Sequence, residues 1–437
     1  MPKALFTDLY ELTMAYSYFK RGLNTPAVFD HYVRPPVRYR RFLVFAGLDS
    51  ALSFLENLRF SQEDLAYLDS LGLFDWHFLD YLEAFRFTGD VWAMDEGEIV
   101  YPGEPLFTVE APRIEAQIVE TALLNTLNFE TLIASKAARV LLAAGREASV
   151  VDFSPRRDHG EDAAMKVARS AYLAGFDGTS NTEAGRRWGI PVVGTMAHSY
   201  VMSFPDELTA FRAFAEDHPR PILLIDTYDT MEGLEHAILV AKELEAQGRR
   251  LVGVRIDSGD LPELTQKVRA RLDEAGLSYV KIFISGDLDE YKIRDFKAAG
   301  GVAWGYGVGT RLGTSFDLPA FSGVYKLVWD ADGPRIKKSP GKRTLPGKKQ
   351  VWRQEEGDLV ALRPEVHPGR PLLRRVMERG KRLVPAPDLA ALRQATREKL
   401  FALPEEQRVI DRPQAPTYPV RVSEKLKQLQ EGTASHV

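Results

Sequence analysis

The sequence predicts an α/β protein: an incomplete, TIM-like α/β barrel plus an N-terminal α+β domain that the C-terminal segment completes. From Ser149 onward, apolar runs of strand length alternate with amphipathic stretches of helix length, a pattern typical of a parallel sheet with crossover helices. Successive runs lie about 20 to 30 residues apart, the length of one βα unit. Shorter, mixed segments precede this region, and strand-like pieces return after it. We therefore expect an N-terminal domain at 1–115, with 340–437 packed on it, and a barrel domain at 116–339.

The N-terminal part mixes both kinds of element. Helical spacing of apolar residues predicts helices and alternation predicts strands. The stretch from Gly89 to Pro112 is rich in β-forming residues and is interrupted by Gly97 and Pro102-Gly103, which predicts a small sheet or half-barrel. The other expected elements are a strand at 27–33 and helices at 8–19, 48–58, 62–71 and 116–144.

In the barrel domain, most strand-like runs end at polar or glycine residues and precede a helical pattern. Asp229 and Glu232 resemble a capping box at the start of one helix, and Gly300-Gly301 ends another. A barrel is favoured over an open sheet. Strands are expected at 149–153, 190–193, 221–225, 251–254, 280–284 and 303–306, and helices at 229–247, 261–275 and 289–299. A basic segment, further strand-like pieces, a helix near 389–401 and a polar tail follow.

Composition excludes several classes of function. The 437 residues are 45% apolar and 27% charged, which suits a large core under a polar surface. With 57 Lys and Arg against 61 Asp and Glu, no overall basic field attracts nucleic acid or an anionic membrane. The absence of cysteine excludes disulfides, thiolate nucleophiles and cysteine-bound zinc. An acidic residue as early as Asp8 argues against a signal peptide, so a cytoplasmic protein is expected.

Aspartates with hydroxyl or glycine neighbours follow three consecutive predicted strands: DTYDT at 226–230, RIDSGD at 255–260 and SGDLD at 285–289. The C-terminal ends of parallel barrel strands converge on one face, so six carboxylates are expected around one mouth. Such carboxylates suit sugar hydroxyls, or Mg²⁺ that carries a phosphorylated sugar. The alternative for each motif is a simple helix N-cap, and the succession of three favours a functional site.

Carboxylates repel phosphate, so separate anion sites are expected. In GVGTR at 307–311, glycines allow backbone N–H groups to approach phosphate oxygens, and Arg311 adds charge; a structural turn is the alternative. Arg156-Arg157 follows a predicted strand, although a solvated pair is the commoner explanation. A third cationic group, Ser135-Lys136 with Arg139, would more often be helix surface charge.

His198 lies in GTMAHS at 194–199, directly after the predicted strand at 190–193, and is expected to reach the same mouth. An isolated histidine is usually structural. At a site of this kind it acts as a general acid or base, or as a nucleophile that forms a phosphoramidate. No triad or metal-ligand spacing in the sequence decides between these roles.

Distinctive segments lie in order along nearly the whole chain: TDLYELTMAY (7–16), LNTLNFETLIASKAAR (124–139), VDFSPRR (151–157), GTMAHS (194–199), LLIDTYDT (223–230), GVRIDSGDL (253–261), SGDLDEYKI (285–293), GVGTRL (307–312), GVYKLV (323–328) and PGKKQVWR (346–353). Together they resemble the nicotinate phosphoribosyltransferases, a type II phosphoribosyltransferase family. The resemblance implies the joining of nicotinate to phosphoribosyl pyrophosphate in NAD biosynthesis, with coupled ATP hydrolysis through a phosphorylated His198.

The resemblance also implies roles for individual residues. Tyr10, with Asp8 beside it, corresponds to a base-stacking tyrosine that reaches a neighbouring subunit's site, which implies a homodimer. His198, Arg255 and Asp257 are the expected catalytic residues, and Asp257 and Asp260 the expected Mg²⁺ ligands. ATP is expected as co-substrate, and no zinc, flavin or haem. The remaining expected substrate-binding residues are Ser135, Lys136, Arg139, Arg156, Arg157, Ser199, Asp226, Asp229, Ser258, Gly259, Gly286, Asp287, Gly307, Gly309 and Thr310.

One departure and several alternatives accompany this interpretation. Many relatives carry Asn where Gly286 stands, which puts a side-chain contact to phosphate or ribose in doubt. A nicotinamide- or quinolinate-specific transferase is the nearest alternative, and His198 argues against quinolinate. A non-catalytic sensor of phosphoribosyl pyrophosphate is a third. A barrel aldolase or isomerase would require a Schiff-base lysine or a carboxylate base, and no isolated strand-end lysine stands out.

Overall fold

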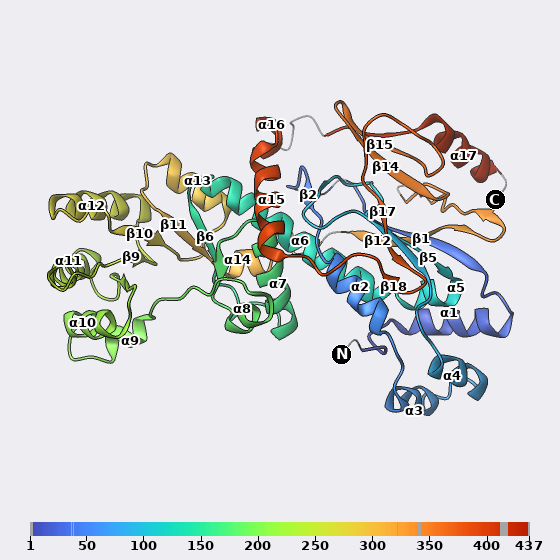
Figure 1. Cartoon of the computed structure of the whole chain (residues 1–437), viewed down its shortest axis with the longest axis horizontal. Helices are drawn as coiled ribbons and strands as arrows, with labels where there is room; N and C mark the ends of the chain where they lie inside the picture. Colours follow the sequence, from blue (N-terminus) through green and yellow to red (C-terminus); the bar gives the residue numbers. More distant parts are fainter. Residues whose placement is uncertain are drawn as a thin grey trace. The chain divides into compact units, whose positions relative to one another are not determined.

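The computed structural model describes residues 3–35, 37, 39–320, 322–339, 342–410 and 418–435. Its contacts divide the chain into two compact units. Unit 1 comprises Met1–Ser135, Ala320–Asp388 and Arg412–Val437, and unit 2 comprises Lys136–Pro319 and Leu389–Asp411. The predicted fold class is confirmed: unit 2 holds a parallel sheet with helices, and unit 1 holds a separate, largely antiparallel sheet that the C-terminal segment completes (Figure 1).

The unit boundaries differ in position from the expected domain boundaries. The first division falls at 135/136, inside the long helix α6 (Glu120–Ala144), rather than at 115/116. Helix α15 (Leu389–Ala402) belongs to unit 2 rather than to the N-terminal domain. Its Arg393 donates to the carbonyl of Phe176, and its Arg397 to that of Gly175, just after α7 (Glu161–Leu173). These hydrogen bonds hold the helix on unit 2.

Unit 1 is built on a seven-stranded sheet in which three strands from the N-terminal part of the chain are flanked on both sides by strands from the C-terminal part. Its order is β13 (Gly333–Pro334), β12 (Gly323–Asp330), β1 (Pro26–Val33), β5 (Phe107–Pro112), β3 (Asp90–Ala93), β17 (Arg374–Glu378) and β18 (Lys381–Arg382). A second sheet runs β16 (Arg370–Pro371), β14 (Lys349–Gln354), β15 (Gly357–Leu362) and β19 (Val420–Val422), and β2 (Leu43–Val44) pairs with β4 (Ile99–Val100). The predicted completion of this domain by the C-terminal segment is therefore visible in the pairing of β3 with β17.

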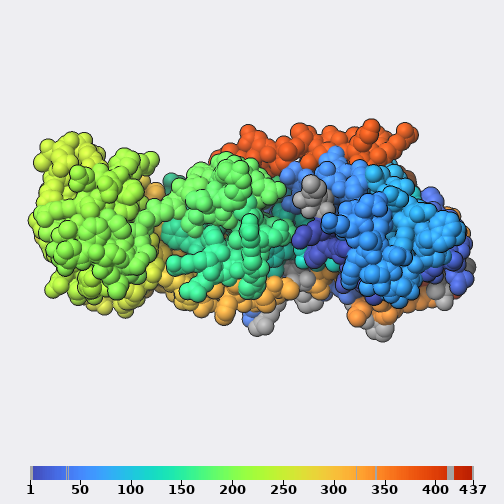
Figure 2. Space-filling model, turned by 90° about the horizontal axis from the view of Figure 1, so that it is seen from below, coloured from blue at the N-terminus to red at the C-terminus, as the bar shows by residue number. Residues whose placement is uncertain are grey.

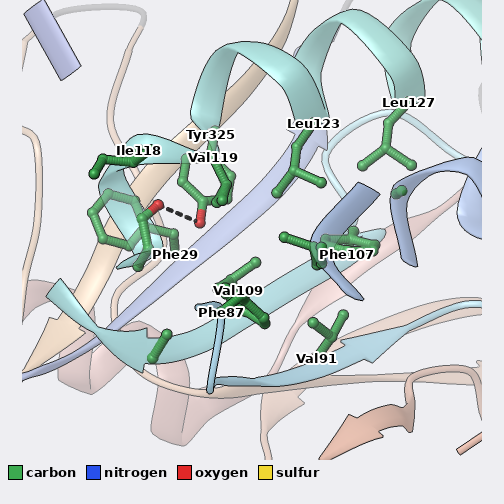
Figure 3. Packing of buried hydrophobic residues seen from close by; sticks show 14 of the residues in the cluster. Phe29, Phe87, Val91, Phe107, Val109, Ile118, Val119, Leu123, Leu127 and Tyr325 are labelled. Atoms are coloured by element: carbon green, nitrogen blue, oxygen red, sulfur yellow. Dashed lines mark hydrogen bonds between the residues drawn. The ribbon is translucent and has the colours of Figure 1, made fainter. Parts of the chain in front are cut away.

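Helices cover this sheet, and their apolar residues form the core with it. The hydroxyl of Tyr325 donates to the carbonyl of Ala116 at 2.9 Å, and its ring stacks on Phe29 with centroids 4.8 Å apart (Figure 3). Leu123 and Leu127 of α6 point toward the strand residues in the same view. The helices are α1 (Leu9–Lys20), α2 (Leu48–Asn57), α3 (Gln62–Ser70), α4 (Trp76–Glu83), α5 (Arg113–Ile118) and the first part of α6. Helix α17 (Glu424–Ser435) packs on β15 of the second sheet instead.

Two sequence expectations for unit 1 need correction. The helix expected at 116–144 is two helices, because the carboxylate of Glu11 accepts from the backbone N–H of Thr121 at 2.9 Å and so caps a new start for α6. The polar C-terminal tail contains helix α17, whose Leu426 is fully buried. Helices α3 and α4 lie at the surface, where they form part of the bright blue area of Figure 2.

Unit 2 contains six parallel strands: β6 (Ser149–Asp152), β7 (Gly178–Thr179), β8 (Ile222–Leu224), β9 (Gly253–Ile256), β10 (Lys281–Ile284) and β11 (Gly305–Val308). Their order in the sheet is β7-β6-β11-β10-β9-β8. This order follows the chain around a circle that is open between β7 and β8. An isolated parallel bridge between Thr179 and Val192 lies on the β7 side of that opening. The sheet is therefore an incomplete barrel, as the sequence predicted.

Of the strand expected at 190–193, only the bridge between Thr179 and Val192 is present. The last strand lies at 305–308 rather than 303–306. The three predicted crossover helices are present as α11 (Thr230–Ala246), α12 (Leu261–Glu274) and α13 (Glu290–Ala298). The sequence did not predict α7, α8 (Thr182–Trp188), α9 (His198–Met202), α10 (Glu207–Asp217), α14 (Thr310–Gly313) or α16 (Glu405–Arg408). Within the described residues, no helix combines the length and hydrophobicity needed to cross a bilayer.

Candidate active site

A cavity of about 690 Å³ lies at the C-terminal ends of the strands of unit 2. Loops from distant parts of the sequence meet there, at the face where barrel enzymes carry their active sites. Its walls combine cations, carboxylates, hydroxyls, glycines and an aromatic ring. The expected site residues among its lining are Arg156, Arg157, Arg255, Asp257, Gly286, Asp287, Gly307, Gly309 and Thr310.

The loop after β6 supplies four lining side chains: Phe153, Pro155, Arg156 and Arg157. Both arginines are exposed, and within the described residues neither side chain makes a hydrogen bond or an ion pair. Charge that no protein group neutralises is available to an anionic ligand. The sequence motif therefore marks real cavity cations rather than a solvated pair remote from the site.

Arg255 projects from β9 and is largely buried, with 14% of its side chain exposed. It donates to the hydroxyl of Thr195 at 2.5 Å and to the carbonyl of Met196 at 3.3 Å, and its Nη2 lies 3.9 Å from Asp257 Oδ1. Its Nε is buried without a partner. Burial lowers the pKa of Arg255, against the opposing effect of the Asp257 and Asp226 carboxylates. A buried cation with an unused N–H group is suited to an anionic ligand.

The carboxylate of Asp257 is oriented by its neighbours. Ser285, at the end of β10, donates its hydroxyl to Asp257 Oδ1. Asp226, at the end of β8, accepts from the backbone N–H of Asp257 at 2.9 Å and from the hydroxyl of Ser258 at 2.6 Å. Asp226 Oδ1 is buried and has no partner. Asp226 thus supports the turn that presents Asp257, and neither Asp226 nor Ser258 is among the lining residues.

Gly286 lies where no side chain fits. Its φ is +105°, and a Cβ there would stand 2.2 Å from the carbonyl oxygen of Asp257. An Asn, like any residue with a Cβ, is therefore incompatible with this backbone, and position 286 contributes only its main chain. Asp287, also at positive φ, is ion-paired with Lys292 at 2.9 Å and with Arg311 at 3.0 Å.

Of the two glycines expected at the phosphate turn, Gly307 has a different role. A Cβ on Gly307 would stand 2.4 Å from the ring of Phe153, so this glycine makes room for an aromatic side chain. Gly309 and Thr310 line the cavity and remain the candidates for a phosphate turn. Arg311 does not supply free charge, because Asp287 holds its Nε and Asp289 its Nη1 at 3.1 Å.

The six carboxylates do not all surround the mouth, and this expectation is wrong. Asp229, Asp260 and Asp289 cap α11, α12 and α13, where each accepts from backbone N–H groups of the first turn. None of the three lines the cavity. In each motif the later aspartate is thus the helix cap, which satisfies otherwise unpaired donors. Gly259, in the turn before Asp260, also lies outside the lining.

His198 begins α9, close to the open side of the barrel. Its Nδ1 lies 3.1 Å from the hydroxyl of Thr227, which follows β8, while Val192 bridges to β7. The segment between them therefore crosses the opening between β7 and β8. Ala197 and Met196 line the cavity, whereas His198 is adjacent to the lining and Ser199 is exposed.

The third cationic group, Ser135-Lys136 with Arg139, is neither surface charge on a helix nor part of the cavity lining. Lys136 is 1% exposed in its side chain and pairs with Glu290 at 2.6 Å and Asp317 at 2.7 Å. Arg139 donates to Glu290 at 2.8 Å. Burial raises the pKa of Glu290, but Lys136 and Arg139 outweigh it, so the pKa lies below its ordinary value. Ser135, in unit 1, donates to the carbonyl of Thr131 at 2.6 Å. None of these residues lines the cavity.

Asp8 and Tyr10 belong to unit 1, and neither lines the cavity. Asp8 precedes α1 and accepts from the hydroxyl of Thr121 at 2.7 Å. Tyr10 is 46% exposed. Partial burial, together with the carboxylates of Glu120 and Glu11, raises its pKa. An exposed, uncharged aromatic side chain is available for contacts outside its own unit.

Sequence reasoning missed several lining residues. Phe153 ends the predicted strand before Arg156, and Ser285 opens the SGDLD motif, so both had a positional signal. Thr195 and Met196 stand within GTMAHS, but nothing in the motif distinguishes them. The missed residues are Phe153, Pro155, Ser180, Gly194, Thr195, Met196, Ala197 and Ser285. In the described part of the chain, no group of three or more His, Cys, Asp or Glu side chains is arranged to hold a metal ion.

Comparison with known proteins gives one consistent result. Three family models match successive parts of the chain: the nicotinate phosphoribosyltransferase N-terminal domain at residues 5–128, the nicotinate phosphoribosyltransferase family at 148–326, and its C-terminal domain at 348–430. Nicotinate phosphoribosyltransferase pncB2 of Mycobacterium tuberculosis is 48% identical over 97% of this chain and 92% of its own length. The Bacillus subtilis nicotinate phosphoribosyltransferase is 41% identical over 96% and 93%. The crystal structure of human nicotinic acid phosphoribosyltransferase superposes with a TM-score of 0.86 at 30% identity, over 98% of this chain and 99% of that one.

Proposed function

The chain belongs to the nicotinate phosphoribosyltransferase family, and from this premise we propose how the cavity of unit 2 carries out the reaction. The protein is an enzyme of NAD biosynthesis that forms nicotinate mononucleotide and pyrophosphate from nicotinate and phosphoribosyl pyrophosphate. The observation that carries the proposal is the convergence of Arg156, Arg157, Arg255 and Asp257 at the strand ends of an incomplete barrel.

Nicotinate is a flat aromatic acid, so it needs a ring surface and a cation. Phe153 presents a ring to the cavity, and Gly307 gives that ring the space it occupies. Arg255 contributes a buried guanidinium with an unused Nε–H. We place the pyridine ring against Phe153 and its carboxylate toward Arg255, because aromatic rings stack and guanidinium groups bind carboxylates in paired hydrogen bonds.

The phosphates of phosphoribosyl pyrophosphate need cations and backbone donors. Arg156 and Arg157 are the cavity arginines without protein partners among the described residues, and Gly309 with Thr310 forms the adjacent turn. We assign the pyrophosphate to the arginines and the 5′-phosphate to the turn. In this placement the arginines stabilise the charge that develops on the leaving pyrophosphate.

Mg²⁺ accompanies this reaction in our proposal, and the site suits it through Asp257. This carboxylate lines the cavity and is held by the hydroxyl of Ser285. Mg²⁺ is usually bound by one or two carboxylates together with substrate phosphates and water, so a cluster of three protein ligands is not required. When bound, the ion neutralises charge on the pyrophosphate. Asp260 is occupied as a helix cap, which leaves Asp257 as the better ligand.

The displacement at the anomeric carbon is proposed to be dissociative. The bond to pyrophosphate breaks before the bond to the pyridine nitrogen is complete, which leaves positive charge on the ribose. A carboxylate beside the sugar stabilises that charge, and Asp257 is the residue in position to do so. No covalent sugar–enzyme intermediate is needed.

ATP coupling is proposed to proceed through His198. Its Nδ1 lies against the hydroxyl of Thr227, and residues Met196 and Ala197 just before it line the cavity. A phosphorylated histidine beside the pyrophosphate site would add charge and acceptor oxygens there. We also propose a homodimer in which the exposed Tyr10 of one subunit, with Asp8 beside it, completes the partner's site.

The decisive experiment is mononucleotide formation from phosphoribosyl pyrophosphate and Mg²⁺, with nicotinate, nicotinamide and quinolinate offered in parallel, each with and without ATP. We expect turnover of nicotinate, stimulated by ATP. Preference for nicotinamide would overturn the base assignment, and binding without turnover of any base would favour a sensor.

Two variants test the residues. His198→Ala should lose the ATP stimulation, whereas His77→Ala, at an exposed histidine of α4, should retain it. Full stimulation in the His198 variant would refute the phosphohistidine. Arg157→Ala should raise the KM for phosphoribosyl pyrophosphate, whereas Arg186→Ala, at an exposed arginine of α8, should not. An unchanged KM in the Arg157 variant would refute the phosphate placement.

A further inference from the structure

The loop that carries Arg156 and Arg157 is held by one residue, Ser154. The backbone N–H of Ser154 donates to the buried Asp152 at 2.9 Å, and its carbonyl accepts from the N–H of Arg157 at 2.7 Å and of Asp158 at 3.2 Å. Its hydroxyl donates to Asp158 Oδ2 at 2.9 Å. The two arginines therefore stand on a turn that the side chain of Asp158 closes.

The second oxygen of Asp158 faces a different element, the short helix α14 (Thr310–Gly313). Asp158 Oδ1 is buried without a partner, and it lies where a Cβ on Gly313 would come within 1.7 Å. Gly313 ends α14, the short helix that begins directly after Gly309. The same missing Cβ would stand 2.9 Å from the Cβ of Ser154. The arginine loop and the Gly309–Thr310 turn are thus packed together through Asp158, and only a glycine permits this approach.

The buried site of Asp158 disfavours the charged form of its carboxyl group. The packing against Ser154 and Gly313 therefore holds the side chain there. Burial raises the pKa of Asp158 to about 6, against the hydrogen bond from Ser154, and the nearby Asp152 adds to the rise. A buried carboxyl oxygen without a donor normally destabilises a fold.

We propose that Asp158 is a positioning residue for phosphoribosyl pyrophosphate, because it sets the distance between Arg156-Arg157 and the Gly309–Thr310 turn. Asp158 touches neither substrate nor reacting atoms. It acts through the arginines by closing the turn on Ser154 and by wedging that turn against Gly313. The inference rests on the proposed placement of the phosphates at these two segments.

The test is a double-mutant cycle with Asp158→Ala and Gly313→Ala, together with Asp158→Asn, read as KM for phosphoribosyl pyrophosphate, KM for nicotinate and kcat. Asp158→Ala should raise the KM for phosphoribosyl pyrophosphate about tenfold, the effect of weakening one charge-assisted hydrogen bond. The KM for nicotinate and kcat should change much less. Asp158→Asn retains the shape and an oxygen that accepts from Ser154, so it should restore a KM close to that of the native chain. Asp162→Ala, at an exposed aspartate of α7, is the matched control.

The cycle distinguishes a positioning role from general structural damage. Gly313→Ala should raise the same KM in the native chain, because its methyl group displaces Asp158, but should add much less once Asp158 is alanine, when only the 2.9 Å contact with the Cβ of Ser154 remains. If the two increases in KM for phosphoribosyl pyrophosphate multiply in the double variant, the proposal is overturned. A lower thermal midpoint with an unchanged KM in Asp158→Ala would overturn it as well. If Asp158→Ala yields no folded protein, an unchanged KM in Gly313→Ala overturns it alone. If Arg156→Ala and Arg157→Ala also leave the KM unchanged, the phosphate placement itself is wrong, and the inference is overturned with it.

Discussion

Gly286→Ala should reduce activity far more than it reduces stability. The new Cβ would stand 2.2 Å from the carbonyl oxygen of Asp257, so the two backbones must separate by about 1 Å to reach ordinary contact. A displacement of this size at a catalytic group costs about 100-fold in rate. The positive φ of +105° adds a conformational cost of roughly 1–3 kcal/mol to the free energy of folding.

Gly248→Ala separates these two effects. Gly248 also has a positive φ, +71°, but nothing lies within 4 Å of its missing Cβ. This control should lose about 1 kcal/mol of stability, roughly 1 °C in the thermal midpoint of a 437-residue chain, and should retain native kcat/KM. Both variants are assayed for nicotinate mononucleotide formation at saturating nicotinate and varied phosphoribosyl pyrophosphate.

A displacement of Asp257 by about 1 Å is expected to cost about 100-fold in rate. If Gly286→Ala retains kcat/KM within about threefold of the Gly248→Ala value, the predicted displacement of Asp257 is refuted. It is also refuted if both variants lose activity only in proportion to their loss of folded protein.

Three further predictions follow from buried or oriented groups. Lys136→Met leaves Glu290 buried without one of its cations and should destabilise the protein by about 3–5 kcal/mol, seen as a lower thermal midpoint with unchanged KM values. Burial raises the pKa of Glu11 to about 7, above its unfolded value, so the folded state binds the proton more tightly and stability should fall as pH rises from about 4.5 through 7. Thermal midpoints from pH 5 to 8 should show this fall in the native chain and a smaller one in Glu11→Gln; equal slopes would contradict it. Ser285→Ala removes a hydrogen bond to Asp257 and should lower kcat/KM by about tenfold without a matching loss of stability, and an unchanged kcat/KM would show that Asp257 needs no such support.

Much of unit 2 could be predicted from the sequence because its signals are local. The helix predicted at 229–247 is α11 at Thr230–Ala246, and the helix predicted at 261–275 is α12 at Leu261–Glu274. Helical periodicity and capping residues specify such elements within a few turns of chain. The cavity position was also predictable, because parallel strands direct their C-terminal ends to one face.

The individual contacts in the site could not be predicted. Lys136 pairs with Glu290, and Arg311 pairs with Asp287 and Asp289, so these cations are occupied while Arg156 and Arg157 are not. Their sequence surroundings do not show which of them is paired, because the ion-pair partners of Lys136 and Arg311 come from other segments of the chain.

The sequence by itself determined the family, the α/β class, the crossover helices α11, α12 and α13, and the motifs that meet at the strand ends. The tertiary structure alone decided which aspartate of each motif caps a helix and which cation keeps its charge available. It also decided that Gly307 makes room for Phe153 and that Asp158 packs against Gly313. The physical reason is range: propensity and capping act over a few neighbouring residues, whereas burial and ion pairing depend on residues brought together from distant parts of the chain.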